Sequence, residues 1–180
     1  MRLVNVVGGG DLNIPINLHQ FASKYNLPDL DYEPEIYSGV KFKLNEDGPT
    51  IMLFRTGTYH ITGAKSINDL HATDEQLISF IRDNVGLGSE QPTGPEVRNL
   101  VYVQDYGQEL DLNELSVGLG MENIEYDPDV HPSLHYNPKK GGHLMIFRTG
   151  KLIFTGVADT SEAHQIVNEF LEKLDSMFDL

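Results

Sequence analysis

The feature that most constrains this chain is an internal duplication. Four short blocks recur in the same order, at an offset of 94 residues for the first two and 93 for the last two. The pairs are Val4–Val7 with Arg98–Val101, Tyr32–Tyr37 with Tyr126–His131, Leu53–Gly57 with Ile146–Gly150, and Thr62–Ala64 with Thr155–Val157. Two copies are too few for an open solenoid and favour a pseudo-symmetric pair. We therefore predict repeats at residues 1–90 and 97–180, joined by a Gly/Pro-rich linker at 91–96.

Both repeats predict the same series of elements. Each begins with a strand (3–7; 99–103) and a short helix (17–25; 111–119). Three strands follow (38–44, 50–55 and 58–62; 133–136, 143–148 and 151–155), and a longer amphipathic helix closes the repeat (73–85; 161–178). Apolar residues of the last helix recur at i, i+3, i+4 and i+7, and Thr160 or Ser161 is placed to cap it. The pattern predicts an α+β fold with an antiparallel sheet covered by helices on one side.

Composition excludes several classes of protein. The sequence has 13 Lys and Arg against 27 Asp and Glu, a net charge of −14, and no cysteine. Without cysteine there are no disulfides, no Cys-ligated zinc and no thiol catalysis. No segment has the ~18 consecutive apolar residues that cross a membrane, and we expect no signal peptide and a cytoplasmic protein. The total charge alone argues against nucleic acid, because nucleic-acid-binding proteins usually carry a basic surplus.

The hairpin strands modify that argument, because their alternation separates two faces. One set is apolar enough to pack on the helices: Ile51, Leu53, Arg55, Gly57, Tyr59 and Ile61, with Leu144, Ile146, Arg148, Gly150, Leu152 and Phe154 in the second repeat. The other set mixes apolar residues with Thr, Lys and His and has no carboxylate: Met52, Phe54, Thr56, Thr58, His60 and Thr62, with Met145, Phe147, Thr149, Lys151, Ile153 and Thr155. An exposed sheet face is normally charged. This face is therefore a candidate binding surface or a face that packs on another subunit.

The sequence gives little support for a nucleotide-binding loop, a metal site or a catalytic motif. Gly8-Gly9-Gly10 follows a strand but lacks the further spaced glycine and the Gly-Lys-Ser/Thr of nucleotide loops, so we interpret it as a flexible turn. Asp129, His131, His135 and His143 suggest a metal site, but no two of them form an i, i+4 pair on a helix. No nucleophile motif is present. We expect no enzyme, no metal and no cofactor.

The repeated blocks resemble the core domain of the TATA-box-binding protein family, over about residues 3–178. The resemblance lies in Asn-Val-Val at 5–7, Tyr-Glu-Pro-Glu at 32–35, Phe-Arg-Thr-Gly at 54–57 and Thr-Gly-Ala-Lys at 62–65, with their second-repeat counterparts. It implies a ten-stranded antiparallel saddle with helices on the convex face. It also implies a general transcription initiation factor of archaeal, halophilic type, whose concave sheet binds and bends A/T-rich promoter DNA in the minor groove.

The resemblance implies a role for individual residues. Asn5 and Asn99, with Thr62 and Thr155, match central donors to base acceptors. Val7, Val101, Met52, Met145 and Ile153 match apolar contacts to sugars and bases, and Thr56, His60 and Thr149 complete the face. Phe54 and Phe147 match one member of each wedging phenylalanine pair, whereas the other members fall on Tyr37 and His131. Of the six basic positions that contact phosphates in the family, three remain basic here, at Lys43, Lys65 and Lys151. The other three hold Thr58, Asn137 and Ala158.

The same family supplies the expected partners. Asp127, Asp129 and Val130 match the loop that docks transcription factor B, and RNA polymerase is expected in the same pre-initiation complex at the nucleoid. The three lost cations and the charge of −14 predict a protein that works in concentrated salt, where the Debye length is about 3 Å at 1 M. The alternative is a diverged paralogue that binds a protein partner through this face and binds TATA sequences weakly or not at all.

Overall fold

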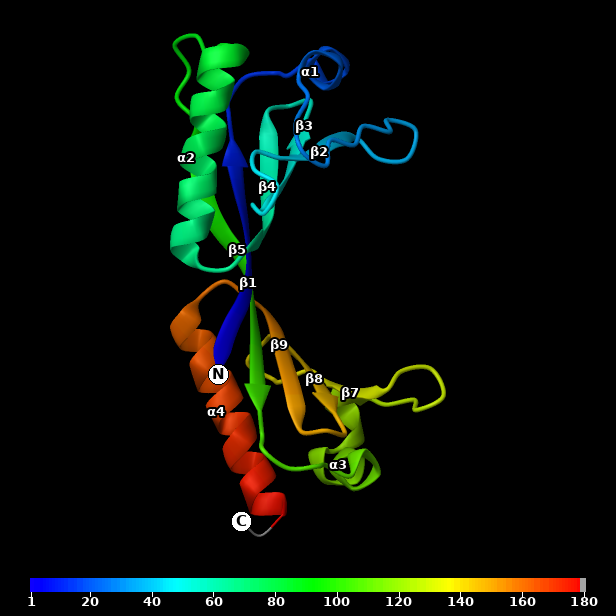
Figure 1. The fold of residues 1–180 in the computed structure, drawn as a ribbon. Helices are drawn as coiled ribbons and strands as arrows, with labels where there is room; N and C mark the ends of the chain where they lie inside the picture. Colours follow the sequence, from blue (N-terminus) through cyan, green and yellow to red (C-terminus); the bar gives the residue numbers. More distant parts are fainter. Residues whose placement is uncertain (179–180) are drawn as a thin grey trace. The chain divides into compact units, whose positions relative to one another are not determined.

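The computed structural model describes residues 1–178, which form two compact units. One unit contains Asn5–Arg98, and the other contains Met1–Val4 together with the chain from Asn99 onward. We call them the first half and the second half and describe each by itself (Figure 1). The strands at residues 2–11 and 93–105 each cross the boundary and are described with the half that holds most of their residues.

The first half is a four-stranded hairpin array with two helices. Its elements are β1 (Arg2–Asp11), α1 (Leu18–Lys24), β2 (Gly39–Lys43), β3 (Thr50–Phe54), β4 (Thr58–Ala64) and α2 (Ile67–Asn84). The strands are antiparallel in the order β2-β3-β4-β1. Figure 1 shows α2 running along one side of these strands. Between them lies a core of fully buried side chains that includes Phe42, Ile51, Leu53, Ile61 and Leu77.

The second half repeats this arrangement. Its elements are β5 (Thr93–Asp105), α3 (Leu112–Leu119), a short 3-10 helix η1 (Met121–Asn123), β6 (Ile124–Glu125), β7 (Ser133–Tyr136), β8 (His143–Phe147), β9 (Lys151–Val157) and α4 (Thr160–Met177). The strand order is β5-β9-β8-β7-β6. Leu134, Leu144, Ile146, Leu152 and Phe170 are buried in its core. Residues 179–180 of the predicted second repeat lie outside the described part of the chain.

Nine strands are formed within residues 1–178, all antiparallel, where the resemblance implied ten. The counterpart of β6 in the first half is reduced to a single bridge between Asp31 and Lys41. Each of these residues donates its backbone N–H to the carbonyl of the other, at 2.8 and 2.9 Å. One such pair is too short to count as a strand, although it closes the edge of the first half in the same way.

The three consecutive glycines are strand residues, so their interpretation as a flexible turn is wrong. Gly8, Gly9 and Gly10 lie within β1. A Cβ on Gly9 would stand 2.1 Å from the carbonyl oxygen of Tyr59, and one on Gly10 would stand 2.2 Å from that of Thr93. These glycines therefore permit close backbone contact with the neighbouring strands rather than flexibility.

Close backbone approach also places a strand in the segment expected as a linker. Strand β5 begins at Thr93, and the backbone of Gly94 lies against that of Gly10. Pro95 has no N–H to give to a sheet, yet it is part of this strand. Gly94 and Pro95 therefore belong to a strand that packs closely on its neighbour, and do not mark only a turn.

Capping residues explain where two helices begin. Helix α2 starts at Ile67, six residues before the predicted start, because the Ser66 hydroxyl accepts the N–H of Asp69 at 3.0 Å while the Asp69 carboxylate accepts the N–H of Lys65 at 2.8 Å. Helix α4 is capped by Asp159, whose carboxylate accepts the N–H of Glu162 at 2.8 Å. The predicted caps Thr160 and Ser161 are instead its first helical residues.

A buried polar pair distinguishes the two cores. The Tyr59 hydroxyl donates to the Asp74 carboxylate, and both side chains are almost completely buried. Burial is the main cause that raises the pKa of Asp74 above its ordinary value. The corresponding positions of the second half hold Leu152 and Val167, both buried. The same site in the fold is thus filled by a hydrogen-bonded pair in one half and by apolar side chains in the other.

None of the helices within residues 1–178 is long and apolar enough to span a membrane.

Candidate nucleic-acid interface

The strand register builds one exposed face in the first half. Lys41, Met52, His60 and Gly9 follow one another across β2, β3, β4 and β1, and Lys43, Thr50 and Thr62 form a second row. Phe54 stands opposite Gly39, with its ring edge-on to that of His60 at 5.3 Å between centroids. Thr56 lies in the turn after β3, and Lys65 follows β4. The predicted separation into a buried and an exposed parity is confirmed here.

The second half presents the equivalent face. His135, Met145, Ile153 and Val103 form one row, and His143 stands opposite Thr155 in another. Phe147 lies opposite Ser133, and Met145, Phe147 and Ile153 are half-buried. Thr149 lies in the turn that leads to Lys151 at the start of β9. Ile153 takes the place that His60 has in the first half, so this row is more apolar.

The two predicted asparagines are held in a defined orientation. The Asn5 carboxamide oxygen accepts the N–H of Gly63 at 2.8 Å, and that of Asn99 accepts the N–H of Gly156 at 2.8 Å. Both glycines have a positive φ, +89° and +94°, which favours glycine. With the oxygen occupied, each side chain directs its NH₂ group elsewhere. Val7 and Val101 are half-buried on the same strands.

The asparagines differ in one respect. Asn99 exchanges hydrogen bonds with the hydroxyl of Thr155, at 2.9 and 3.1 Å. Thr62, the counterpart of Thr155, is exposed. The second-half pair is therefore ordered before any ligand binds.

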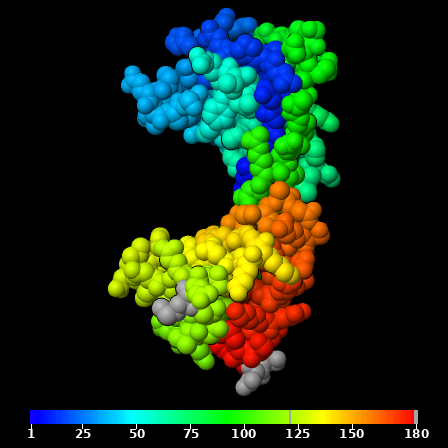
Figure 2. Space-filling model, turned by 180° about the vertical axis from the view of Figure 1, so that it is seen from behind, coloured from blue at the N-terminus to red at the C-terminus, as the bar shows by residue number. Residues whose placement is uncertain are grey.

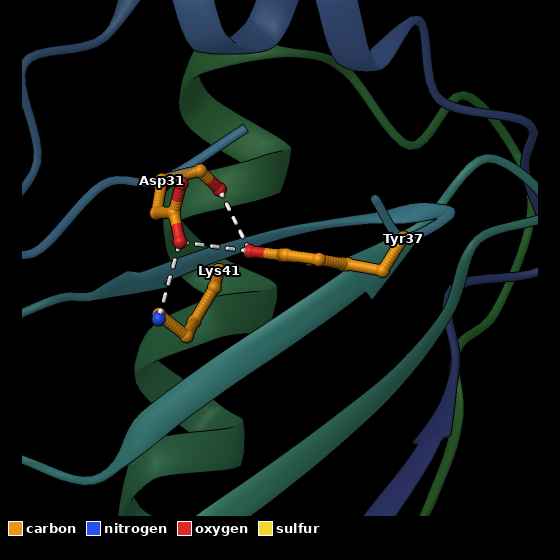
Figure 3. Close-up of polar contacts among 3 residues, drawn as sticks. All are labelled: Asp31, Tyr37 and Lys41. Carbon is orange, nitrogen blue, oxygen red and sulfur yellow. Dashed lines mark hydrogen bonds and ion pairs between the residues drawn. The ribbon is translucent and has the colours of Figure 1, made fainter. Parts of the chain in front are cut away.

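The aromatic residues beside Phe54 and Phe147 also differ between the halves. Tyr37 is half-buried, and its hydroxyl donates to the backbone carbonyl and the carboxylate of Asp31 at 3.3 and 3.2 Å (Figure 3). Burial, and then the hydrogen bond to Asp31, raise the pKa of Tyr37. The same carboxylate pairs with Lys41 at 3.2 Å. His131, the counterpart of Tyr37, is exposed.

A chain of imidazoles replaces this ion pair in the second half. Ser133 Oγ lies 3.1 Å from His135 Nε2, His135 Nδ1 lies 3.0 Å from His143 Nε2, and His143 Nδ1 lies 2.8 Å from Asn137 Oδ1. The His131 ring stands 5.5 Å from that of His135. Burial is the main cause that lowers the pKa of His143, followed by His135, while Glu125 opposes them. Among residues 1–178, no group of three or more His, Cys, Asp or Glu has the geometry to hold a metal ion.

Carboxylates are confined to the margins of these faces. Asp11 and Asp105 stand opposite Thr58 and Lys151 at the ends of β1 and β5. Each bends back to accept a backbone N–H two residues later, at 2.8 and 2.9 Å. Asp31 and Glu125 lie at the opposite edges, beside Lys41 and His135. The middle of each face is therefore free of acids among the described residues, as the alternation predicted.

The predicted cations are located around the faces rather than in their middle. Lys65 and Lys151 are exposed. Lys43 is half-buried and pairs with Asp29 at 2.9 Å. Lys41, His135 and His143 share the exposed parity but are not among the residues predicted for this face, and the two histidines are considered above only as metal ligands. The same alternation of buried and exposed residues, continued to the residue before Leu144 and into β2 and β7, places all three on the exposed face.

The predicted partner loop projects from the second half. Asp127 accepts the N–H groups of Val130 and His131 on its backbone carbonyl, at 3.1 and 2.9 Å, and that of Asp129 on its carboxylate at 3.1 Å. The turn leaves Val130 64% exposed, and its counterpart Ile36 is 73% exposed. In Figure 2 the loop before β2 (light blue) and the loop before β7 (yellow-green) each stand out from their own half.

Comparison with known proteins places this geometry in a family. The family model described as "Transcription factor TFIID (or TATA-binding protein, TBP)" matches residues 1–84 and again residues 94–177. The chain is 33% identical to TATA-box-binding protein C of Halobacterium salinarum, covering 98% of both chains, and 29% identical to the TATA-box-binding protein of Archaeoglobus fulgidus, covering 98% of this chain and 96% of the other. The solved structure of Methanococcus jannaschii TBP matches with a TM-score of 0.82 and 28% identity, over 97% of this chain and 98% of the other. These matches confirm the predicted resemblance and fold class, and the relatives include proteins of salt-loving archaea such as Halobacterium salinarum.

Proposed function

The chain belongs to the TATA-binding protein family of DNA-binding transcription factors, and from that membership we propose that it binds A/T-rich promoter DNA through the minor groove, bends it, and recruits transcription factor B and RNA polymerase. The observation that carries the proposal is the exposed face of each half, which holds an oriented asparagine and, among residues 1–178, has no carboxylate in its middle.

The orientation of the asparagines supports a preference for A·T pairs. With Oδ1 occupied by a glycine N–H, Asn5 offers its NH₂ group as a donor. The NH₂ group of Asn99 already donates to the Thr155 hydroxyl at 2.9 Å and keeps its second N–H for a base. In the minor groove A·T and T·A pairs present acceptors only, whereas a G·C pair adds the guanine amino donor. A donor facing that amino group would be left unsatisfied, which disfavours G·C at the positions these side chains reach.

Apolar side chains on the same faces support bending. The apolar side chains of the exposed parity are half-buried: Phe54, Phe147, Met52, Met145 and Ile153. Insertion of an apolar wedge at a base step costs on the order of a few kcal/mol of stacking, which the additional contact with bent DNA offsets. Lys43, Lys65 and Lys151 are the proposed phosphate contacts. Tyr37, Thr56, His60, Thr62, Val7, Val101, His131, Thr149 and Thr155 complete the proposed surface.

The proposed contact with transcription factor B uses Asp127, Asp129 and Val130. An exposed aliphatic side chain that follows two exposed aspartates suits a partner with a basic, partly apolar surface. Asp127 also shapes its own turn, so Asp129→Asn and Val130→Ser are the cleaner variants. They should weaken formation of the ternary complex with transcription factor B and leave DNA binding alone unchanged in a gel-shift assay.

Fluorescence anisotropy tests the DNA-binding proposal. In molar potassium chloride, an A/T-rich promoter duplex should bind more tightly than a G/C-rich duplex of equal length, and Asn5→Ala combined with Asn99→Ala should remove most of the difference. Equal binding of the two duplexes, or none at any salt concentration, would contradict the proposal. It would instead favour a paralogue that uses this face for a protein partner.

A further inference from the structure

Two neighbouring histidines of the second half, His135 and His143, are assigned no role by the family pattern. They lie on the exposed face, in the rows that contain Met145 and Thr155. Their rings are half-buried and connected by a direct hydrogen bond of 3.0 Å between Nδ1 of His135 and Nε2 of His143. The inference that follows rests on the proposed DNA contact of this face.

The partners of the two rings fix where the protons lie. Asn137 Oδ1 can only accept, so His143 must carry its proton on Nδ1. A neutral His143 then accepts at Nε2, and His135 must carry its own proton on Nδ1. Its Nε2 is left to accept the hydroxyl of Ser133. When both histidines are neutral, each hydrogen bond between Ser133 and Asn137 therefore has only one possible donor and one possible acceptor.

This arrangement accepts one additional proton without movement of either imidazole ring. His135 Nε2 becomes a donor, and the Ser133 hydroxyl turns to accept it. A second proton would have to go to His143 Nε2 and would set two N–H groups against each other at 3.0 Å. The pair therefore has two accessible charge states, neutral and singly cationic.

The position of the pair gives this proton a function. Asn137 lies where the first half has Lys43, so a permanent cation is missing at this edge. The series of hydrogen bonds through the two imidazoles ends at the side chain of Asn137. In the first half the place of His135 is taken by Lys41, whose charge is already balanced by Asp31 (Figure 3).

The surroundings of the pair contain few other charges. Strand β6 contributes Glu125, opposite His135, and the loop before β7 contributes His131. Strands β8 and β9 contribute Met145 and Thr155. The turn after β7 contains Lys139 and Lys140, of which Lys140 pairs with Glu169 of α4. The attraction to Glu125 raises the pKa of His143 and partly opposes the effects of burial and of His135.

We propose that Ser133, His135, His143 and Asn137 form a DNA-backbone contact in the second half that becomes cationic by taking up one proton. DNA binding should then be stronger at acidic than at alkaline pH. A phosphate near the pair stabilises the protonated form and raises its pKa in the complex. The gain in affinity is complete below the pKa of the free protein and disappears as the pH rises through the pKa of the complex. A rise of one pKa unit corresponds to about a tenfold gain.

Anisotropy titrations of an A/T-rich duplex at about pH 8 and about pH 5 in molar potassium chloride measure this gain, because burial lowers the pKa of His143 in the free protein. The unmodified chain should bind about tenfold more tightly at the lower pH. His135→Gln combined with His143→Gln should remove most of the response, leaving what His60 and His131 contribute. His19→Gln on α1, exposed and outside the chain of imidazoles, is the matched control and should keep the full response. Circular dichroism checks that each variant is folded.

Nitrogen NMR of the free protein tests the proton assignment separately. At about pH 8 both His135 and His143 should be the Nδ1–H tautomer. Either histidine as the Nε2–H tautomer, or an unchanged pH response in the double glutamine variant, overturns the inference while leaving the proposed function intact. Absence of DNA binding at every pH overturns both.

Discussion

Single residues differ between the halves in ways that predict opposite outcomes for the same substitution. Tyr59 and Tyr102 are both buried tyrosines of the sheet. The Tyr59 hydroxyl donates to Asp74, whereas the Tyr102 hydroxyl has no hydrogen-bond partner within residues 1–178. Loss of a hydroxyl therefore removes a hydrogen bond in one case and relieves an unsatisfied group in the other.

We expect Tyr59→Phe to lower the free energy of unfolding by about 2 kcal/mol, because it leaves a buried carboxylate without its donor. Tyr102→Phe should leave it unchanged or raise it slightly. Urea unfolding in potassium chloride measures both. The loss in Tyr59→Phe should decrease as the pH falls, because the pKa of Asp74 is raised by burial and protonation removes the uncompensated charge. Equal losses from both variants would contradict this account.

A double variant copies the second half into the first. Tyr59→Leu with Asp74→Val reproduces the buried pair Leu152 and Val167. Replacing a buried hydrogen-bonded pair by apolar side chains is often neutral or stabilising, provided that both partners change together. We therefore expect the double variant to be more stable than Tyr59→Phe alone, measured by the same unfolding transition.

The aromatic wedges give a second residue-level prediction. Phe147 is half-buried and apolar, whereas His131 is exposed and polar, so Phe147→Ala should reduce DNA bending more than His131→Ala. Energy transfer between dyes at the two ends of a promoter duplex measures the bend. Equal reductions would show that His131 also acts as a wedge.

Among the elements, β1 has little room for side chains at its glycines. A Cβ at Gly9 would stand 2.1 Å from a backbone oxygen, which cannot move without separating β1 from β4. Gly9→Ala should therefore destabilise the protein by about 3 kcal/mol or prevent folding. Gly48→Ala is a control in the turn between β2 and β3, where the nearest atom would be 3.2 Å away. It should cost less than about 1 kcal/mol in thermal unfolding.

Alternation and capping decide how much of these elements the sequence predicts. The boundaries of β7 were correct, and Asn17 and Tyr25, the predicted ends of the first helix, are its caps. Helix α2 begins before its apolar periodicity does, because Ser66 and Asp69 cap a first turn that the periodicity does not mark. The strand at Gly8–Gly10 was missed because glycine signals a turn unless the neighbouring backbone is known. The oriented asparagines likewise depend on glycine N–H groups that no local pattern reveals.

For the whole molecule, the net charge of −14 predicts a strong effect of salt. Like charges repel in the folded chain, and potassium chloride screens them. The melting temperature should therefore rise between about 0.1 M and 1 M salt. Glu75→Gln with Glu172→Gln, both exposed on helices, should flatten that rise. A melting temperature that falls with salt would contradict the expectation.

The distribution of charge over the whole molecule matters more for DNA binding than its total. The total of −14 argues against binding to nucleic acid, yet among residues 1–178 the carboxylates lie outside the middle of both exposed faces. Alternation predicted that distribution. It did not predict the edge carboxylates Asp31 and Glu125, because their position depends on contacts with β2 and β7 across the sheet.

The division of the chain has a consequence for engineering. Met1–Val4 belongs to the same compact unit as the chain from Asn99 onward, while the rest of β1 belongs to the other unit. A gene split at the repeat boundary would take the first four residues away from the unit they complete. New termini for a circularly permuted or split version are better placed in the exposed turns at residues 45–47 or 139–141.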